Sequence, residues 1–142
     1  MQTLLEEALL IAVVAHKGQK DKAGEPYIFH PLRLMFRVNS PEEKIVALLH
    51  DVVEDSNVTL TDLKRKGFGG EVIKAVSLLT HDKAVSYQDY VKKIKPNPLA
   101  KSIKVADLED NMNITRLKIK TPDDEERLKK YQWAHQFLNT QT

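Results

Sequence analysis

Apolar residues recur at helical spacing along most of the sequence, and this periodicity is the strongest constraint on the fold. In the first segment Leu5, Ala8, Leu9 and Ala12 repeat every three or four residues, which is the period of an α-helix. Further segments with apolar residues that fit helices are 27–38, 41–53, 59–63, 72–79, 86–94, 99–112 and 121–138. No segment shows the sustained alternation of a strand bounded by hairpin turns. The sequence therefore predicts an all-α fold.

Turn and capping residues divide this pattern into separate helices. Ser40-Pro41-Glu42-Glu43 supplies an N-cap, a proline at the first helical position and an acidic first turn. Residues 18–26 concentrate Gly, Pro and Lys without periodicity, which indicates an exposed loop carrying Lys20 and Lys22. We expect a compact bundle of about seven or eight helices that forms a single domain over residues 1–142.

Composition excludes several classes of protein. The 22 Lys and Arg residues nearly balance 20 Asp and Glu residues and form no basic block, so a nucleic-acid partner is not indicated. The chain has no cysteine, so any metal must be held by histidine nitrogen and carboxylate oxygen. Its first residues are acidic rather than basic, and no apolar run approaches the roughly 18 residues of a membrane span. We expect a cytoplasmic protein without a membrane partner.

Four ionisable residues cluster in the segment that follows Pro41. His50-Asp51 and Glu54-Asp55 stand four positions apart, and in one continuous helix they would share a face. The neighbouring residues are apolar, and a buried ionised carboxylate costs several kcal/mol unless it is paired or coordinated. A bound cation would remove that conflict.

Two distant segments offer partners for this cluster. His30 precedes Pro31 at the start of an expected helix, and Asp107 lies one turn before Asn111 on another. His30, His50, Asp51 and Asp107 would give two imidazoles and two carboxylates, a set that suits Mn²⁺ or Fe²⁺ and tolerates Zn²⁺. A second His-Asp pair, His81-Asp82, has no acidic residue four positions later, and we expect it at a helix end or in a loop without a metal role.

Four short motifs resemble a known family. The segments AHKGQ, PYIFHP, ALLHDVVED and KVADLEDN are similar to those of the HD-domain metal-dependent phosphohydrolases, specifically the RelA/SpoT-type (p)ppGpp hydrolase domain in its small, stand-alone form. The resemblance runs from about Ala15 to Asn111 and more loosely to Tyr131. It implies an HD-type helical hydrolase domain that removes the 3′-pyrophosphate of the stringent-response alarmones ppGpp and pppGpp, yielding GDP or GTP and pyrophosphate.

The resemblance also implies roles for individual residues. His30, His50, Asp51 and Asp107 would bind one Mn²⁺, and Glu54 and Asp55 would orient or deprotonate the attacking water. The substrate-binding candidates are Lys20 and Lys22 for phosphate charge, Asn111 near the ribose and metal, and Tyr131, which would cover the core or reach the nucleotide.

Other functions remain open at this point. One alternative is hydrolysis of a different nucleotide, such as ppApp, a nucleoside phosphate or a dinucleotide cofactor, with the same metal and water. Another is a regulatory module that binds a nucleotide without turning it over. The residues outside the matching motifs are too few for a synthetase domain, so we expect hydrolysis without alarmone synthesis.

Overall fold

The computed structural model describes residues 3–117 and 121–140, and within them it contains nine α-helical segments and no β-sheet. The helices are α1 Leu4–Ala15, α2 Phe29–Arg37, α3 Pro41–Leu49, α4 Val52–Asp55, α5 Leu60–Arg65, α6 Gly70–Leu79, α7 Tyr87–Ile94, α8 Pro98–Leu117 and α9 Pro122–Asn139. In these residues extended pairing is limited to one isolated bridge between Lys20 and Pro26. The predicted all-α fold is confirmed.

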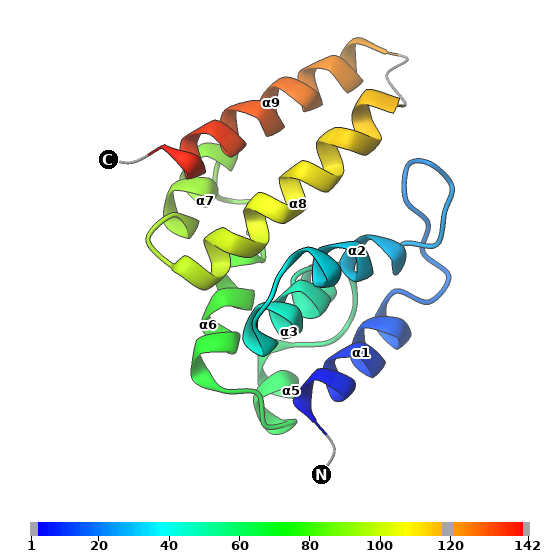
Figure 1. Ribbon diagram of the computed structural model, residues 1–142, viewed down its shortest axis with the longest axis vertical. Helices are drawn as coiled ribbons and strands as arrows, with labels where there is room; N and C mark the ends of the chain where they lie inside the picture. The colour runs from blue at the N-terminus through cyan, green and yellow to red at the C-terminus, as the bar shows by residue number, and fades with distance from the viewer. Residues whose placement is uncertain (1–2, 118–120, 141–142) are drawn as a thin grey trace.

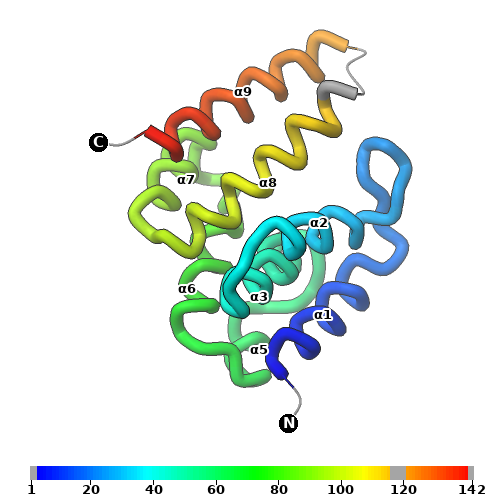
Figure 2. The backbone as a smooth tube through the Cα atoms, viewed as in Figure 1, coloured from blue at the N-terminus to red at the C-terminus, as the bar shows by residue number. Residues whose placement is uncertain are grey.

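Helix α3 lies at the centre of the arrangement (Figure 1). It packs against α1, α2, α6 and α8. The two longest helices, α8 and α9, run antiparallel and side by side. The segment between α1 and α2 forms a loop that projects from the edge of the molecule (Figure 2). The consecutive helices α2 and α3 therefore meet α8, which comes from a distant part of the chain.

Side-chain caps explain where several helices begin. Thr3, Ser40, Thr59 and Thr121 each accept a hydrogen bond from the backbone amide three residues later. In each case the acidic residue at that third position accepts a bond from the cap backbone, which completes a capping box. These reciprocal bonds satisfy amides that have no partner inside the helix. The predicted start at Ser40-Pro41 is confirmed.

The segment from Pro41 to Asp55 differs from the expected continuous helix. Helix α3 ends at Leu49, and the short α4 begins at Val52. The His50 ring donates a hydrogen bond from Nδ1 to the carbonyl of Ala47 at 2.7 Å. An uninterrupted helix would offer that carbonyl to the amide four residues later, so the side chain competes with the helix at this point. The His50-Asp51 pair therefore occupies a turn between two helices.

The apolar core is centred on α3. Every residue from Ile45 to Leu49 is buried, and Leu48 is fully inaccessible to solvent. No helix among residues 3–117 and 121–140 combines the length and apolar character needed to cross a membrane.

We expect Leu48→Ala to lower the free energy of unfolding by about 2–5 kcal/mol, because it removes buried methyl groups and leaves a cavity in a packed core. Leu10→Ala is the matched control, since Leu10 on α1 is 55% exposed and its truncation should cost far less. Urea titration followed by circular dichroism measures both. Equal losses in the two variants would contradict the placement of α3 at the core.

Candidate metal centre and its cavity

His50 leaves α3 with one ring nitrogen already occupied. A carbonyl only accepts hydrogen bonds, so the contact with Ala47 places the proton on Nδ1. The other nitrogen, Nε2, is buried and has no hydrogen-bond partner among the described residues, although Asp51 Oδ2 lies 2.9 Å away. A buried polar atom without a partner costs free energy, so this nitrogen points to a ligand.

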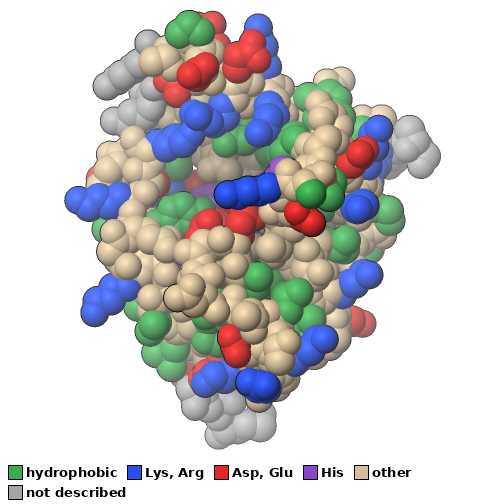
Figure 3. All heavy atoms as spheres, turned by 180° about the vertical axis from the view of Figure 1, so that it is seen from behind, with side chains coloured by type: hydrophobic (Ala, Val, Ile, Leu, Met, Phe, Trp, Pro, Cys, Tyr) green, Lys and Arg blue, Asp and Glu red, His purple; other side chains and the backbone are tan. Residues whose placement is uncertain are grey.

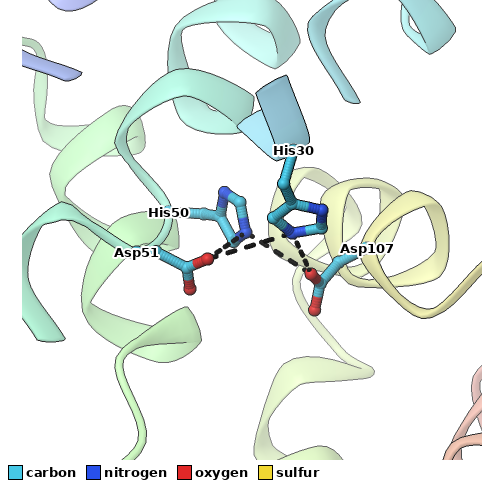
Figure 4. A group of neighbouring side chains, drawn as sticks. All are labelled: His30, His50, Asp51 and Asp107. Atoms are coloured by element: carbon cyan, nitrogen blue, oxygen red, sulfur yellow. Dashed lines mark hydrogen bonds and ion pairs between the residues drawn. The ribbon is translucent and has the colours of Figure 1, made fainter. Parts of the chain in front are cut away.

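His30 and Asp107 approach from two other helices. His30 stands near the start of α2 and Asp107 in the middle of α8, and both are buried. His30 Nε2 lies 2.8 Å from Asp107 Oδ1 and 3.9 Å from Asp51 Oδ2. His50 Nε2 lies 3.5 Å from the same Asp107 oxygen. Figure 4 shows all four side chains pointing toward one another.

This geometry fits one divalent cation. His30, His50, Asp51 and Asp107 each offer one ligand atom, and these four atoms lie within 4.8 Å of one another. Atoms bound roughly 2.0–2.2 Å from one ion lie about 3–4 Å apart, which matches the contacts above. Two imidazoles and two carboxylates form a donor set for borderline first-row metals. The buried His50 Nε2, which among the described residues faces only these two carboxylates and makes no hydrogen bond with either, is the separate observation that favours a metal.

Three neighbouring polar groups hold the two carboxylates in place. Tyr27 donates its hydroxyl hydrogen to Asp51 Oδ2 at 2.5 Å. Lys104 donates to Asp107 Oδ2 at 2.9 Å, and the Asn111 amide donates to Asp107 Oδ1 at 3.1 Å. Burial alone would raise the pKa of Asp51, but its interaction with the His50 ring beside it lowers that pKa to about 2. Both carboxylates are therefore ionised and oriented.

A small cavity of about 200 Å³ opens beside this cluster. Figure 3 shows the molecule from behind, with histidine visible at depth in a hollow that carries both basic and acidic side chains at its rim. The lining residues are Tyr27, His50, Asp51, Glu54, Leu79, His81, Tyr87, Tyr90, Lys104, Asp107, Asn111, Lys130 and Tyr131. The cavity therefore joins acidic, basic and aromatic groups around the candidate metal site.

Glu54 reaches the cavity through a contact that the sequence did not reveal. Its Oε1 accepts a hydrogen bond from the backbone amide of His81 at 2.8 Å. The His81 ring stacks on Tyr90 with ring centroids 4.4 Å apart, and its Nε2 donates to the carbonyl of Val85 at 2.8 Å. His81 lies in the segment between α6 and α7, as expected for this second His-Asp pair, yet it also lines the cavity.

The other acidic candidate, Asp55, lines a different surface. It contributes to a groove between α1 and the residues that follow α4, together with Val14 and Val58. Partial burial of its carboxyl group and the negative charges of Asp51 and Glu54 raise the pKa of Asp55 to about 6. Its charge thus interacts with the cluster, although its side chain does not line the cavity.

The lysines that line the cavity are not the two loop lysines that the sequence suggested as phosphate-binding candidates. Lys20 and Lys22 are exposed on the loop between α1 and α2, whereas Lys104 and Lys130 line the cavity. Lys104 Nζ lies 5.2 Å from the centre of the Tyr90 ring, and Lys130 Nζ lies 4.3 Å from that of Tyr87. Burial and the positive charge of Arg127 lower the pKa of Lys22, so this loop residue interacts with α9.

Sequence reasoning also missed two buried groups near the cluster. His16 is 2% exposed, and its Nδ1 lies 2.9 Å from Gln19 Oε1. Asp110, also buried, contacts the outer nitrogen of His30 at 2.6 Å. Asp110 stands in the motif KVADLEDN three residues after Asp107, and only the distance between α2 and α8 in the folded chain shows its partner.

Comparisons with known proteins agree on one group of relatives. The chain is 32% identical over 120 residues to a guanosine-3′,5′-bis(diphosphate) 3′-pyrophosphohydrolase of Aquifex aeolicus. The matched region is 76% of this chain and 17% of the relative. It is 35% identical over 125 residues to a GTP pyrophosphokinase of Streptomyces coelicolor, covering 79% of this chain and 15% of the relative. The chain thus spans less than a fifth of these curated relatives.

A solved structure matches nearly the whole chain. It is described as a metazoan ortholog of SpoT that hydrolyzes ppGpp, and it superposes with a TM-score of 0.81 at 25% sequence identity. The match covers 98% of this chain and 87% of that chain. No family model matches the sequence. The similarity to this group therefore rests on individual relatives and on the fold.

We expect a divalent cation to raise the thermal unfolding midpoint, because a ligand that binds only the folded state adds about 2.7 kcal/mol at roughly 100 times its Kd. Asp51→Ala should abolish both this rise and the metal content measured by atomic emission, since it removes a charged ligand atom. His135→Ala, which changes a histidine outside the cluster, should retain both. Full metal content in Asp51→Ala would contradict the assignment of the site.

Proposed function

Because the chain belongs to the RelA/SpoT-type family, we propose that it hydrolyses guanosine alarmones, converting ppGpp or pppGpp and water to GDP or GTP and pyrophosphate. The observation that carries this proposal is the convergence of two imidazoles and two carboxylates beside a cavity that also holds Glu54 and two lysines. The relatives from Aquifex aeolicus and the metazoan structure, which are named for this hydrolysis, support the choice of substrate.

The proposed ligands of the cation are His30, His50, Asp51 and Asp107. When bound, a divalent cation lowers the pKa of a coordinated water and stabilises charge on phosphate oxygens. We propose Mn²⁺, with Fe²⁺ or Zn²⁺ as alternatives, because mixed imidazole and carboxylate donors suit these ions.

Glu54 is proposed to take the proton of the attacking water. Its carboxylate lines the cavity beside Asp51, and the His81 amide fixes one of its oxygens. The water oxygen forms a bond to the phosphorus that is attached to the ribose 3′ oxygen. The bond between that phosphorus and the 3′ oxygen breaks. One proton of the water passes to Glu54, and a proton is delivered to the leaving 3′ oxygen, so that GDP or GTP with a free 3′ hydroxyl and pyrophosphate are released. Asp55, the second acidic candidate, lines the neighbouring groove, and we propose that it influences this proton transfer through its negative charge.

The basic groups are proposed to bind the phosphates. Lys130 lies over the Tyr87 ring at the cavity wall, where it faces the space that a polyanionic nucleotide would enter. Lys20 and Lys22 on the projecting loop are proposed to add to this positive charge from outside. Asn111 and Tyr131 also line the cavity, which supports their assignment to substrate binding.

The described residues support the proposal of one HD-type hydrolase domain over residues 1–142. They pack around one apolar core to which every helix contributes, with Leu34, Leu48, Ile103 and Leu138 all fully buried. The chain carries no cysteine, and we place the activity in the cytoplasm, where nucleotides are made and consumed.

A panel of nucleotides tests the substrate. We expect purified protein with Mn²⁺ to release pyrophosphate from ppGpp and pppGpp, with GDP and GTP identified by chromatography. If ppApp, a nucleoside phosphate or a dinucleotide cofactor is turned over faster, that compound and not the guanosine alarmone is the substrate. Tight binding of ppGpp without release of pyrophosphate would instead indicate a regulatory module.

Glu54→Gln tests the proton acceptor. The amide keeps the shape of the side chain but cannot accept the proton, so kcat should fall by roughly 10²–10⁴-fold, while metal content stays unchanged. Glu71→Gln on α6 is the matched control, because Glu71 is exposed and does not line the cavity. An unchanged kcat in Glu54→Gln would remove Glu54 from the mechanism.

A further inference from the structure

Behind His30 lies a buried carboxylate that is not one of the four candidate ligands. Asp110 on α8 is 3% exposed. Its Oδ2 lies 2.6 Å from His30 Nδ1, on the side of the ring that faces away from the cluster. The opposite nitrogen, Nε2, is the one that lies 2.8 Å from Asp107. The two nitrogens of His30 therefore face two different carboxylates.

Arg33 fixes Asp110 from the other side. Its Nε donates to Asp110 Oδ1 at 2.8 Å, and its Nη2 donates to Oδ2 at 2.9 Å. This two-pronged contact holds the plane of the carboxylate, and its planar fork gives more directional control than a single ion pair. Paired with this guanidinium, Asp110 is an ionised acceptor.

An ionised carboxylate can only accept hydrogen bonds, so Asp110 holds a hydrogen on His30 Nδ1. Nε2 faces Asp107 in the same way, and when a cation is bound the Nε2 hydrogen would be lost and its lone pair would serve the metal, while Nδ1 keeps its bond to Asp110. A histidine whose outer N–H donates to a carboxylate is also a stronger electron donor at its inner nitrogen. Asp110 thus has the geometry to set both the orientation and the donor strength of His30.

His50 offers an internal comparison. Its outer nitrogen donates to a neutral backbone carbonyl, that of Ala47, within the same turn of chain. The partner of His30 is instead a charged side chain 80 residues away, fixed by an arginine one turn after His30 on α2. The orientation of His50 follows from its local backbone, whereas that of His30 depends on the packing of α2 against α8.

We propose that Asp110, held by Arg33, is a positioning residue that fixes the tautomer and orientation of His30 and thereby strengthens metal binding at the cluster. This inference rests on the proposed metal-dependent function. If Asp110 only joined α2 to α8, its removal would lower the stability of the fold but not the affinity of the folded site for a cation. The positioning role predicts a loss of that affinity.

The test compares metal affinity with stability in matched variants. Asp110→Ala removes the acceptor, Asp110→Asn keeps a neutral acceptor oxygen, and Glu43→Gln is the control. Like Asp110, Glu43 is a carboxylate that joins another helix to α8, because on α3 it accepts a 2.6 Å hydrogen bond from Ser102 on α8. It is not one of the four candidate ligands. Zn²⁺ affinity is measured by competition with a chelator, and stability by thermal unfolding of the metal-free proteins.

We expect Asp110→Ala to weaken Zn²⁺ binding by about 10- to 100-fold, and Asp110→Asn to weaken it less. Glu43→Gln should keep the affinity of the unaltered protein even where its unfolding midpoint falls. If Asp110→Ala and Asp110→Asn bind Zn²⁺ as tightly as the unaltered protein, the positioning role is wrong. Equal losses of affinity in Glu43→Gln and Asp110→Ala would also overturn it, because they would show a general effect of loosened packing.

Nuclear magnetic resonance of ¹⁵N-labelled histidine separates this inference from the proposed function. In the metal-free protein the His30 Nδ1 hydrogen should be protected from exchange with solvent, and Asp110→Ala should remove that protection. If Asp110→Ala loses this protection but the unaltered protein binds no divalent cation, the proposed function and the metal-binding part of this inference are wrong. The hydrogen bond between His30 and Asp110 would still stand. Unprotected Nδ1 in the unaltered protein would overturn the inference alone.

Discussion

The structure depends on bringing two carboxylates and two imidazoles into a space from which most water is excluded. His30, His50 and Asp107 are all buried, and each comes from a different part of the chain. Buried charges are tolerated when they are paired, hydrogen-bonded or coordinated. The groups around the cluster meet this demand, because Lys104 and Asn111 contact Asp107 and Tyr27 contacts Asp51. The packing of α2, α3 and α8 therefore depends on the same contacts that orient the charged groups of the site.

The helices were predictable because their signals are local. A capping box such as that of Ser40 and Glu43 joins residues three apart, so its residue types appear together in the sequence. The break at His50 was not predictable from periodicity, since Val52 and Val53 continue the apolar pattern across it. The interruption follows from a side-chain contact with Ala47, and apolar spacing alone carries no information about that choice.

Residues of the site were predictable to the degree that they form motifs. The structure brings together the two histidines and two aspartates that the motifs grouped. It also adds His81 to the cavity wall, and the relevant contact there is a backbone amide with Glu54, which no residue type encodes. The lysines show the same limit, because Lys130 sits on a helix rich in charge and only the position of α9 beside the cavity distinguishes it from its neighbours.

Charge balance around the cluster explains why these basic groups matter together. With a divalent cation on two neutral imidazoles, the charges of Asp51 and Asp107 offset that of the ion. Asp110 is matched by Arg33 in a two-pronged contact. At the cavity wall the two lysines, Lys104 and Lys130, then exceed the single carboxylate of Glu54, which leaves an excess positive charge. A polyanionic nucleotide would meet this charge at short range and with little water between, where electrostatic attraction is strongest. The same lysine that stabilises the buried Asp107 thus favours a phosphate-bearing ligand over a neutral one.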